Sequence, residues 1–170
     1  PLDACIYYGI RGAGRQLSFI TRLAEVTNDA RWIALRDRII NIVLSSGQWD
    51  SARGMYFWGR DNTDNTISAG AYAAGARILS PFELGAFAEG MFRAYQATGN
   101  AEIKNRLVAM ARFVDQYGIN PACQYTGYRF GIVNGQPWYS GGCTESVYTT
   151  SLVDILVMGY KLTGDQTLLN

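Results

Sequence analysis

Acid–base chemistry in this chain must come from few residue types, because its 170 residues include no histidine. That absence excludes Ser-His-Asp and Cys-His catalysis, histidine-ligated zinc and histidine proton shuttles. Asp, Glu, Tyr, Lys, Arg and Cys remain. The best-placed carboxylates lie at predicted helix starts and in the first long loop: Glu83, Glu145, Asp61 and Asp64.

Each of these carboxylates also has a purely structural explanation. Glu145 and Glu83 stand where a negative charge favours the positive end of a helix dipole, and Pro81 suits the first turn of the helix that contains Glu83. Asp61 and Asp64 can satisfy backbone amides of a turn. A catalytic role therefore requires two of these carboxylates to face one another across a cleft.

The run from Asp61 to Thr66 is rich in oxygen ligands and invites a calcium interpretation. It lacks the glycine at the sixth position and the acid at the twelfth that an EF-hand loop requires, since Thr66 and Tyr72 stand there. A calcium site of another kind remains an alternative. We predict no metal and no cofactor.

Aromatic side chains gather in the two segments that lack helical character. Trp and Tyr rings combine an apolar face with a polar edge, and sugar rings pair an apolar face with hydroxyl rims. These aromatics are therefore candidates for contacting carbohydrate, with burial against neighbouring helices as the alternative for each. With nearby polar partners, the candidate substrate-binding residues are Trp49, Trp58, Tyr128, Arg129, Trp138, Tyr139 and Tyr148.

The three cysteines of the chain give information about the cellular compartment in which the protein is found. Cys123 and Cys143 bracket a glycine- and aromatic-rich loop, and we predict a disulfide between them, which would stabilise the fold by roughly 3 kcal/mol. Two buried thiols are the alternative. Cys5 is left over and needs a partner elsewhere or stays free. The disulfide favours a secreted, periplasmic or cell-surface location.

Composition narrows the class of protein. Hydrophobic residues make up 48% of the chain and charged residues 17%, which is typical of an ordered globular domain. The formal net charge of +1 gives no electrostatic case for nucleic acid or an anionic membrane. No stretch approaches the length of a membrane span. We expect one domain over residues 1–170.

The elements that must position these side chains are helical hairpins. Three segments share one pattern of helix end, tight turn and helix start. Gly99 and Gly164 suit the left-handed conformation that closes a helix, as does Asn28 less comfortably. The next residue of each turn can cap the following helix with a side-chain oxygen. The three turns are Thr27-Asn28-Asp29, Thr98-Gly99-Asn100 and Thr163-Gly164-Asp165.

Helical periodicity flanks these turns, and long loops join the hairpins. Apolar residues recur at intervals of three and four over 84–95 and 103–117, and shorter runs do so over 32–43 and 152–159. Between hairpins, Tyr128–Val133 has strand character and Asn134-Gly135 is a strong hairpin signal. Met55–Trp58 is a weaker strand. Long loops at matching places in a repeat usually gather on one face, often the binding face.

Repeated hairpins with an [Ala/Gly]-Tyr-x-x-Thr-Gly-[Asn/Asp] turn, carried by Ala94–Asn100 and Gly159–Asp165, resemble the six-hairpin glycosidase-like α/α toroids. The resemblance covers most of the chain and implies an all-α fold of antiparallel helical-hairpin repeats, a partial α/α toroid, with β-hairpin or long-loop insertions. It implies that the loop-side ends of the inner helices line a carbohydrate cleft. A complete toroid is longer, so we expect the remainder of the same protein or another chain to complete the fold.

The resemblance implies a carbohydrate-active protein, foremost a glycoside hydrolase that uses paired carboxylates on a poly- or oligosaccharide. The first alternative is a non-catalytic scaffold or binding module for glycan or protein. The second is a polysaccharide lyase or sugar epimerase, in which Tyr128 or Tyr148 would act as the base and Arg129 or Arg60 would neutralise a uronate. A flat aromatic surface with acids only at helix caps would favour the binding module.

Overall fold

The computed structural model describes residues 10–57, 76–140 and 146–169. These residues are mostly helical, with two small antiparallel sheets. The helices are α2 (Ile10–Thr27), α3 (Ala30–Ser45), α5 (Pro81–Thr98), α6 (Ala101–Tyr117) and α7 (Thr149–Thr163), with short 3₁₀ helices η1 (Ser146–Tyr148) and η2 (Gln166–Leu169). The strands are β1 (Trp49–Asp50), β2 (Met55–Tyr56), β3 (Arg77–Leu79), β4 (Phe130–Val133) and β5 (Gln136–Tyr139).

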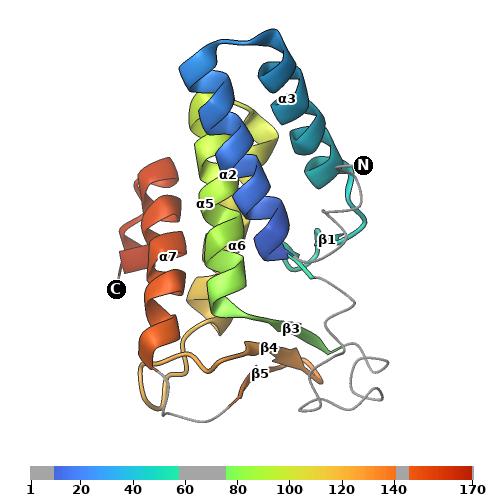
Figure 1. Cartoon of the computed structure of the whole chain (residues 1–170). Helices are drawn as coiled ribbons and strands as arrows, with labels where there is room; N and C mark the ends of the chain where they lie inside the picture. The colour runs from blue at the N-terminus through green and yellow to red at the C-terminus, as the bar shows by residue number, and fades with distance from the viewer. Residues whose placement is uncertain (1–9, 58–75, 141–145, 170) are drawn as a thin grey trace.

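The helices form two complete hairpins and the start of a third. Helices α2, α5 and α7 lie in a row, with α2 against α5 and α5 against α7. Helix α3 packs on α2, and α6 packs on α5 and α7. Figure 1 shows the chain ascending through α2, α5 and α7 and descending through α3 and α6. We call the end that carries the three hairpin turns the turn end, and the opposite end, where the sheet lies, the loop end.

The three hairpin turns have one geometry, as the sequence repeat predicted. Asn28, Gly99 and Gly164 all have positive φ, at 48°, 65° and 74°. In each turn the residue after them accepts a backbone N–H two positions further on, at 2.8, 3.0 and 3.1 Å. The third turn leads into the 3₁₀ helix η2, where the sequence had predicted the start of an α-helix.

A threonine bond that the sequence did not predict completes each turn. The hydroxyl of Thr27, Thr98 or Thr163 donates to the carbonyl four residues earlier, at 2.7, 2.7 and 2.8 Å. The same oxygen accepts the backbone N–H two residues later, at 3.3, 3.3 and 3.1 Å. One side chain thereby satisfies a carbonyl of the ending helix and an amide of the starting one.

Small residues let α2 and α5 approach closely. A Cβ on Gly90 would overlap the backbone of Gly14, and a Cβ on Gly14 would overlap the backbone of Ala86 and Phe87. Ala86 and Gly90 thus form a small-residue face of α5 that lies against α2. Close helix packing here builds a core that includes Leu17, Leu84, Phe87 and Met91.

The three-stranded sheet joins two loops. β4 and β5 form the predicted hairpin, and its Asn134-Gly135 turn has φ values of 52° and 75°. β3, just before α5, pairs with β4, so the segment leading into α5 lies beside the hairpin that precedes α7. The sequence did not predict β3. In the first loop, β2 takes up part of the strand predicted over Met55–Trp58 and pairs with β1.

None of the helices described is long and apolar enough to cross a bilayer. Cys5 and Cys143 lie outside the described residues, so the Cys123–Cys143 disulfide stays a prediction.

Candidate functional site

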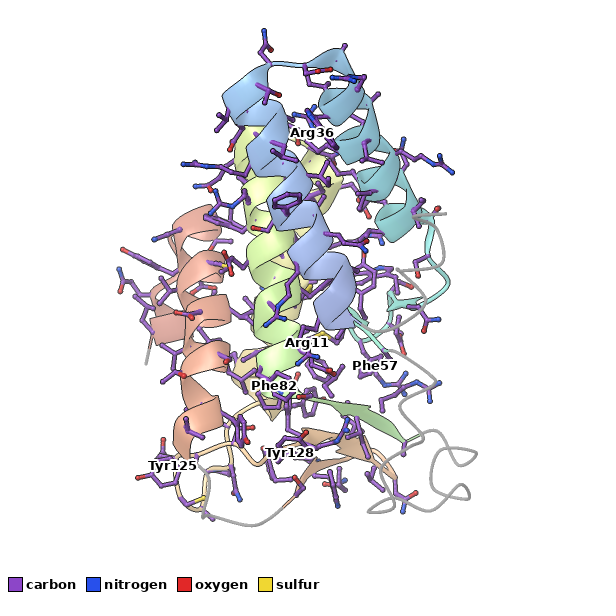
Figure 2. All side chains as sticks on the ribbon, in the orientation of Figure 1. Arg11, Arg36, Phe57, Phe82, Tyr125 and Tyr128 are labelled. Atoms are coloured by element: carbon purple, nitrogen blue, oxygen red, sulfur yellow. The ribbon has the colours of Figure 1, made fainter. Side chains whose placement is uncertain are left out.

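Three aromatic rings from three different segments meet at the loop end. Phe82 is the second residue of α5, Tyr128 precedes β4, and Tyr148 ends η1 where α7 begins. The ring centroids lie 6.0 Å apart for Phe82–Tyr128, 6.2 Å for Phe82–Tyr148 and 5.3 Å for Tyr128–Tyr148. We call these three residues the aromatic cluster. Figure 2 labels Phe82 and Tyr128 at this end of the helices.

Two guanidinium groups lie against the aromatic cluster. The Cζ of Arg11, in the first turn of α2, is 5.6 Å from the centroid of Phe82, and that of Arg129 is 5.5 Å from the centroid of Tyr128. The ring faces attract these cations. Guanidinium groups also bind carboxylates and hydroxyls through planar donor pairs. Apolar ring faces and cationic donors therefore stand side by side.

The aromatic cluster remains accessible to a ligand. Arg11 and Tyr128 are exposed, whereas Phe82, Arg129 and Tyr148 are half-buried. The inner rings are held in place by packing while the outer groups face solvent. That combination is expected of a binding surface rather than of a closed core.

Local backbone contacts explain why Tyr128 reaches this position. The backbone N–H of Thr126 donates to the Thr149 hydroxyl at 3.2 Å, which ties the loop to the start of α7. Arg129 accepts the Ser140 N–H at 2.9 Å and donates its own N–H to the Ser140 hydroxyl at 2.7 Å. A Cβ on Gly127 would overlap the Ser140 carbonyl, so only glycine permits this approach. Tyr128 is thus fixed between two anchored neighbours.

Of the four candidate carboxylates, the described residues include one. Glu83 lies in the first turn of α5, next to Phe82 in sequence, and is half-buried. Pro81 occupies the start of that helix, as predicted, which agrees with the helix-dipole explanation of Glu83. Glu145, Asp61 and Asp64 lie outside the described residues, as do Arg60 and Trp58. The paired-carboxylate hypothesis therefore stays a prediction.

Trp49 packs between the first loop and α6. Its ring lies 4.8 Å from that of Tyr56 and 4.9 Å from the Cζ of Arg106. Arg106 is buried and donates to the Tyr56 hydroxyl at 2.6 Å and to the Leu44 carbonyl at 2.8 Å. Burial raises the pKa of Tyr56 to about 12, although Arg106 opposes that shift. These contacts join the first loop to α6 and give Trp49 a structural role.

The two aromatic side chains of β5 lie on opposite faces of the sheet. Tyr139 packs on the main core, donates its hydroxyl to the Ile119 carbonyl at 3.0 Å, and has its pKa raised by burial. Trp138 packs with Ala76 and Ile78 in a separate small cluster. Both are half-buried. Neither belongs to the aromatic cluster, and a contact with glycan through them stays a prediction.

Sequence reasoning identified Tyr128, Arg129 and Tyr148 but missed Phe82 and Arg11. A signal for the missed pair was present in the repeat. Arg11 lies sixteen positions before Thr27, and Phe82 lies sixteen positions before Thr98. They occupy equivalent places in neighbouring hairpins, and the structure brings them into contact.

No three His, Cys, Asp or Glu side chains gather into a metal-binding group within residues 10–57, 76–140 and 146–169. The calcium alternative at Asp61–Thr66 lies outside these ranges.

Comparison of the chain with protein-family models, curated proteins and solved structures finds no match.

Proposed function

We propose that the loop end of this molecule binds carbohydrate through the aromatic cluster. The observation that carries the proposal is the meeting of Phe82, Tyr128 and Tyr148 with Arg11 and Arg129 on an accessible surface. Ring faces cover the apolar side of a pyranose, and guanidinium and phenol groups bind its hydroxyl or carboxyl substituents. The rings are tilted to one another by 36° to 72°, so they present faces in different directions.

The arrangement of hairpins supports an α/α toroid as the wider architecture. Helices α2, α5 and α7 lie in a row with their N-terminal ends toward the loop end, and α3 and α6 pack behind them. Inner helices of a toroid have this relation to outer ones. In such a fold the aromatic cluster would stand at the rim of the cleft. The same proposal includes two further statements. The remainder of the same protein or another chain completes the ring, and the protein is secreted, periplasmic or located at the cell surface.

The roles of several described carboxylates favour a site that binds glycan without hydrolysing it. Asp29 and Asp165 cap helices at the turn end, while Asp50 and Glu102 form ion pairs with arginines. Glu83 is the candidate that lies at the start of an inner helix, at the loop end. A glycoside hydrolase needs a second carboxylate to face Glu83, for which Asp61, Asp64 and Glu145 are the candidates.

A second candidate function is β-elimination on a uronate. The structure brings together a pair of phenols, Tyr128 and Tyr148, and places Arg129 against the ring of Tyr128. One tyrosine oxygen would take the proton beside the carboxylate, a carbon–carbon double bond would form as the bond to the glycosidic oxygen breaks, and the other tyrosine would donate a proton to that departing oxygen. The arginine would neutralise the carboxylate. Elimination leaves an unsaturated, ultraviolet-absorbing product, whereas hydrolysis leaves a saturated one. Incubating the chain with a polyuronate and recording absorbance separates the two reactions.

The test of the binding proposal is a titration of the chain with a panel of neutral and acidic oligosaccharides, comparing Tyr128→Ala with Tyr125→Ala. Tyr125 is the matched control, because it lies in the same loop, is 41% exposed against 38% for Tyr128, and has no ring contact with the cluster. We expect Tyr128→Ala to weaken binding about tenfold and Tyr125→Ala to leave it unchanged. Equal binding by both folded variants would contradict the proposal.

A further inference from the structure

A groove runs between α2 and α5 along the surface that faces away from the core. It has a volume of about 510 Å³, and its lining includes Arg15, Phe19, Arg22, Glu89 and Arg93. We call it the α2–α5 groove. Arg15 and Arg22 are exposed, and the Phe19 side chain is 63% exposed, so the groove is open to a ligand.

Helix geometry aligns these side chains in one direction. Arg11, Arg15 and Arg22 lie on one stripe of α2, separated by four and seven residues. At 1.5 Å per residue the stripe extends about 16 Å from the loop end toward the turn end. On α5, Phe82, Glu89 and Arg93 are separated by seven and four residues and also share one stripe. Arg15 and Ala86 line the groove at its end nearer the loop end, and each lies four residues after Arg11 or Phe82, so the groove begins about one helical turn from the aromatic cluster.

The groove carries an excess of positive charge that the protein itself does not neutralise. Three arginines face a single carboxylate, that of Glu89. Arg15, Arg22 and Arg93 form no salt bridge with any described residue. The Nε of Arg93 is buried and has no hydrogen-bond partner in the part of the chain described. A buried donor without a partner costs free energy.

The repeat places two of these cations at equivalent positions. Arg22 lies five residues before Thr27, and Arg93 lies five residues before Thr98. The neighbouring hairpins therefore present guanidinium groups side by side at the far end of the groove. The chain as a whole has a net charge of only +1, so this concentration of charge is local.

We propose that the α2–α5 groove binds the acidic groups of a polysaccharide chain whose other end contacts the aromatic cluster. Arg15, Arg22 and Arg93 bind the carboxylate or sulfate groups, and Phe19, between Arg15 and Arg22 on the same stripe, covers the apolar face of an intervening sugar. The inference rests on the proposed glycan-binding function and names its substrate class. A neutral glycan would leave these arginines unpaired, and a globular acidic protein would not follow a narrow groove between two helices.

The experiment compares three ligands of matched length: an oligogalacturonate, its carboxyl-reduced neutral counterpart and a dextran sulfate oligomer. Binding to the chain is measured by calorimetry at low and at physiological salt. We expect the acidic ligands to bind at least about tenfold more tightly than the neutral one, with a preference that falls as salt rises. The two acidic ligands distinguish carboxylate from sulfate as the recognised group.

The variant that tests the groove is the double substitution Arg22→Gln and Arg93→Gln. Its matched control is Lys104→Gln with Arg112→Gln, which removes the same charge from a groove on the outer face of α6. We expect the first pair to weaken acidic-glycan binding roughly tenfold and to leave neutral-glycan binding unchanged. The control pair should change neither. Arg22→Lys with Arg93→Lys retains the charge and should retain part of the affinity, which separates binding from folding.

The possible outcomes test the groove and the glycan-binding function separately. If charged and neutral ligands bind equally, or if the control pair weakens binding as much as the groove pair, the inference is overturned while glycan binding stands. If an oligonucleotide of equal charge competes as well as oligogalacturonate, the groove is a general polyanion site and the acidic-glycan assignment is wrong. If Tyr128→Ala leaves all binding unchanged, the proposed function fails independently of the groove.

Discussion

The turn end and the loop end of this molecule are built in opposite ways. At the turn end, three segments far apart in sequence repeat the same few hydrogen bonds within about 0.3 Å of one another. At the loop end, the described parts of the two connections differ, since one forms the β1–β2 pair and the other the β4–β5 hairpin, and the contacts join residues from different hairpins. The turn end is built from a short pattern that recurs along the sequence, whereas the loop end depends on contacts between separate hairpins.

Unlike the hairpin turns, the long loops should depend on long-range contacts. Substituting Arg106 by Met should lower the free energy of unfolding by about 3 kcal/mol, because it leaves the Leu44 carbonyl and the buried Tyr56 hydroxyl without their donor. Chemical denaturation would measure the loss. Arg112→Met is the control, since Arg112 is an exposed residue of the same helix. Equal, small losses of unfolding free energy in both variants would contradict this prediction, because the contacts of Arg106 with Tyr56 and Leu44 would then add little to stability.

At the turn end, the effect of backbone strain can be measured separately from side-chain contacts. At Gly99 a Cβ would meet no atom within 4 Å, so Gly99→Ala tests only the positive φ of 65° and should cost about 1 kcal/mol. Asn28→Gly should have the opposite sign and stabilise the chain by up to about 1 kcal/mol, since Asn28 adopts φ of 48° with a side chain. Thermal melts of the two variants would establish the signs. The same sign in both would contradict a shared turn geometry.

The repeated threonine bond should be worth the same in every turn. Thr98→Val keeps the shape and removes both hydroxyl bonds, and we expect a loss of about 1 kcal/mol. Thr27→Val and Thr163→Val should match it within a few tenths if the turns are equivalent. A clearly smaller effect at Thr163, whose turn leads into a 3₁₀ helix, would sharpen the comparison by showing that the cap matters only before an α-helix.

The smallest expected effect is on the pH dependence of stability, and it comes from the charge of the helix cap Asp29. Hydrogen bonds from Arg31 lower the pKa of Asp29 from 3.8 to about 2. A carboxyl with a depressed pKa in the folded state stabilises the fold above its unfolded pKa, and that contribution is lost as pH falls from about 4 toward 2. Asp29→Asn should remove part of the acid sensitivity and make the first turn resemble the second, where Asn100 is the cap. A melting series over that pH range would show it, and an unchanged slope would contradict it.

Much of the scaffold was accessible from sequence, because its signals are local. Apolar residues that recur at intervals of three and four over 84–95 and 103–117 predicted α5 and α6, and Asn134-Gly135 predicted the β4–β5 hairpin. The strand β3 was missed, because its three residues have no pattern of their own and pair with β4 from a distant part of the chain. The arginine stripe of α2 was also missed, because its meaning depends on which face α5 leaves open.

The sequence by itself determined the hairpin turns, since each turn is built from bonds between residues no more than four positions apart. Only the tertiary structure decided which residues come together at the loop end. It brought Tyr128 and Tyr148 to Phe82 and Arg11, and packed Trp49 against Arg106. Turn geometry follows from short-range hydrogen bonds and steric limits on φ, which are readable residue by residue. Contacts between loops follow from how closely the helices pack, which Gly14 on α2 and Gly90 on α5 permit.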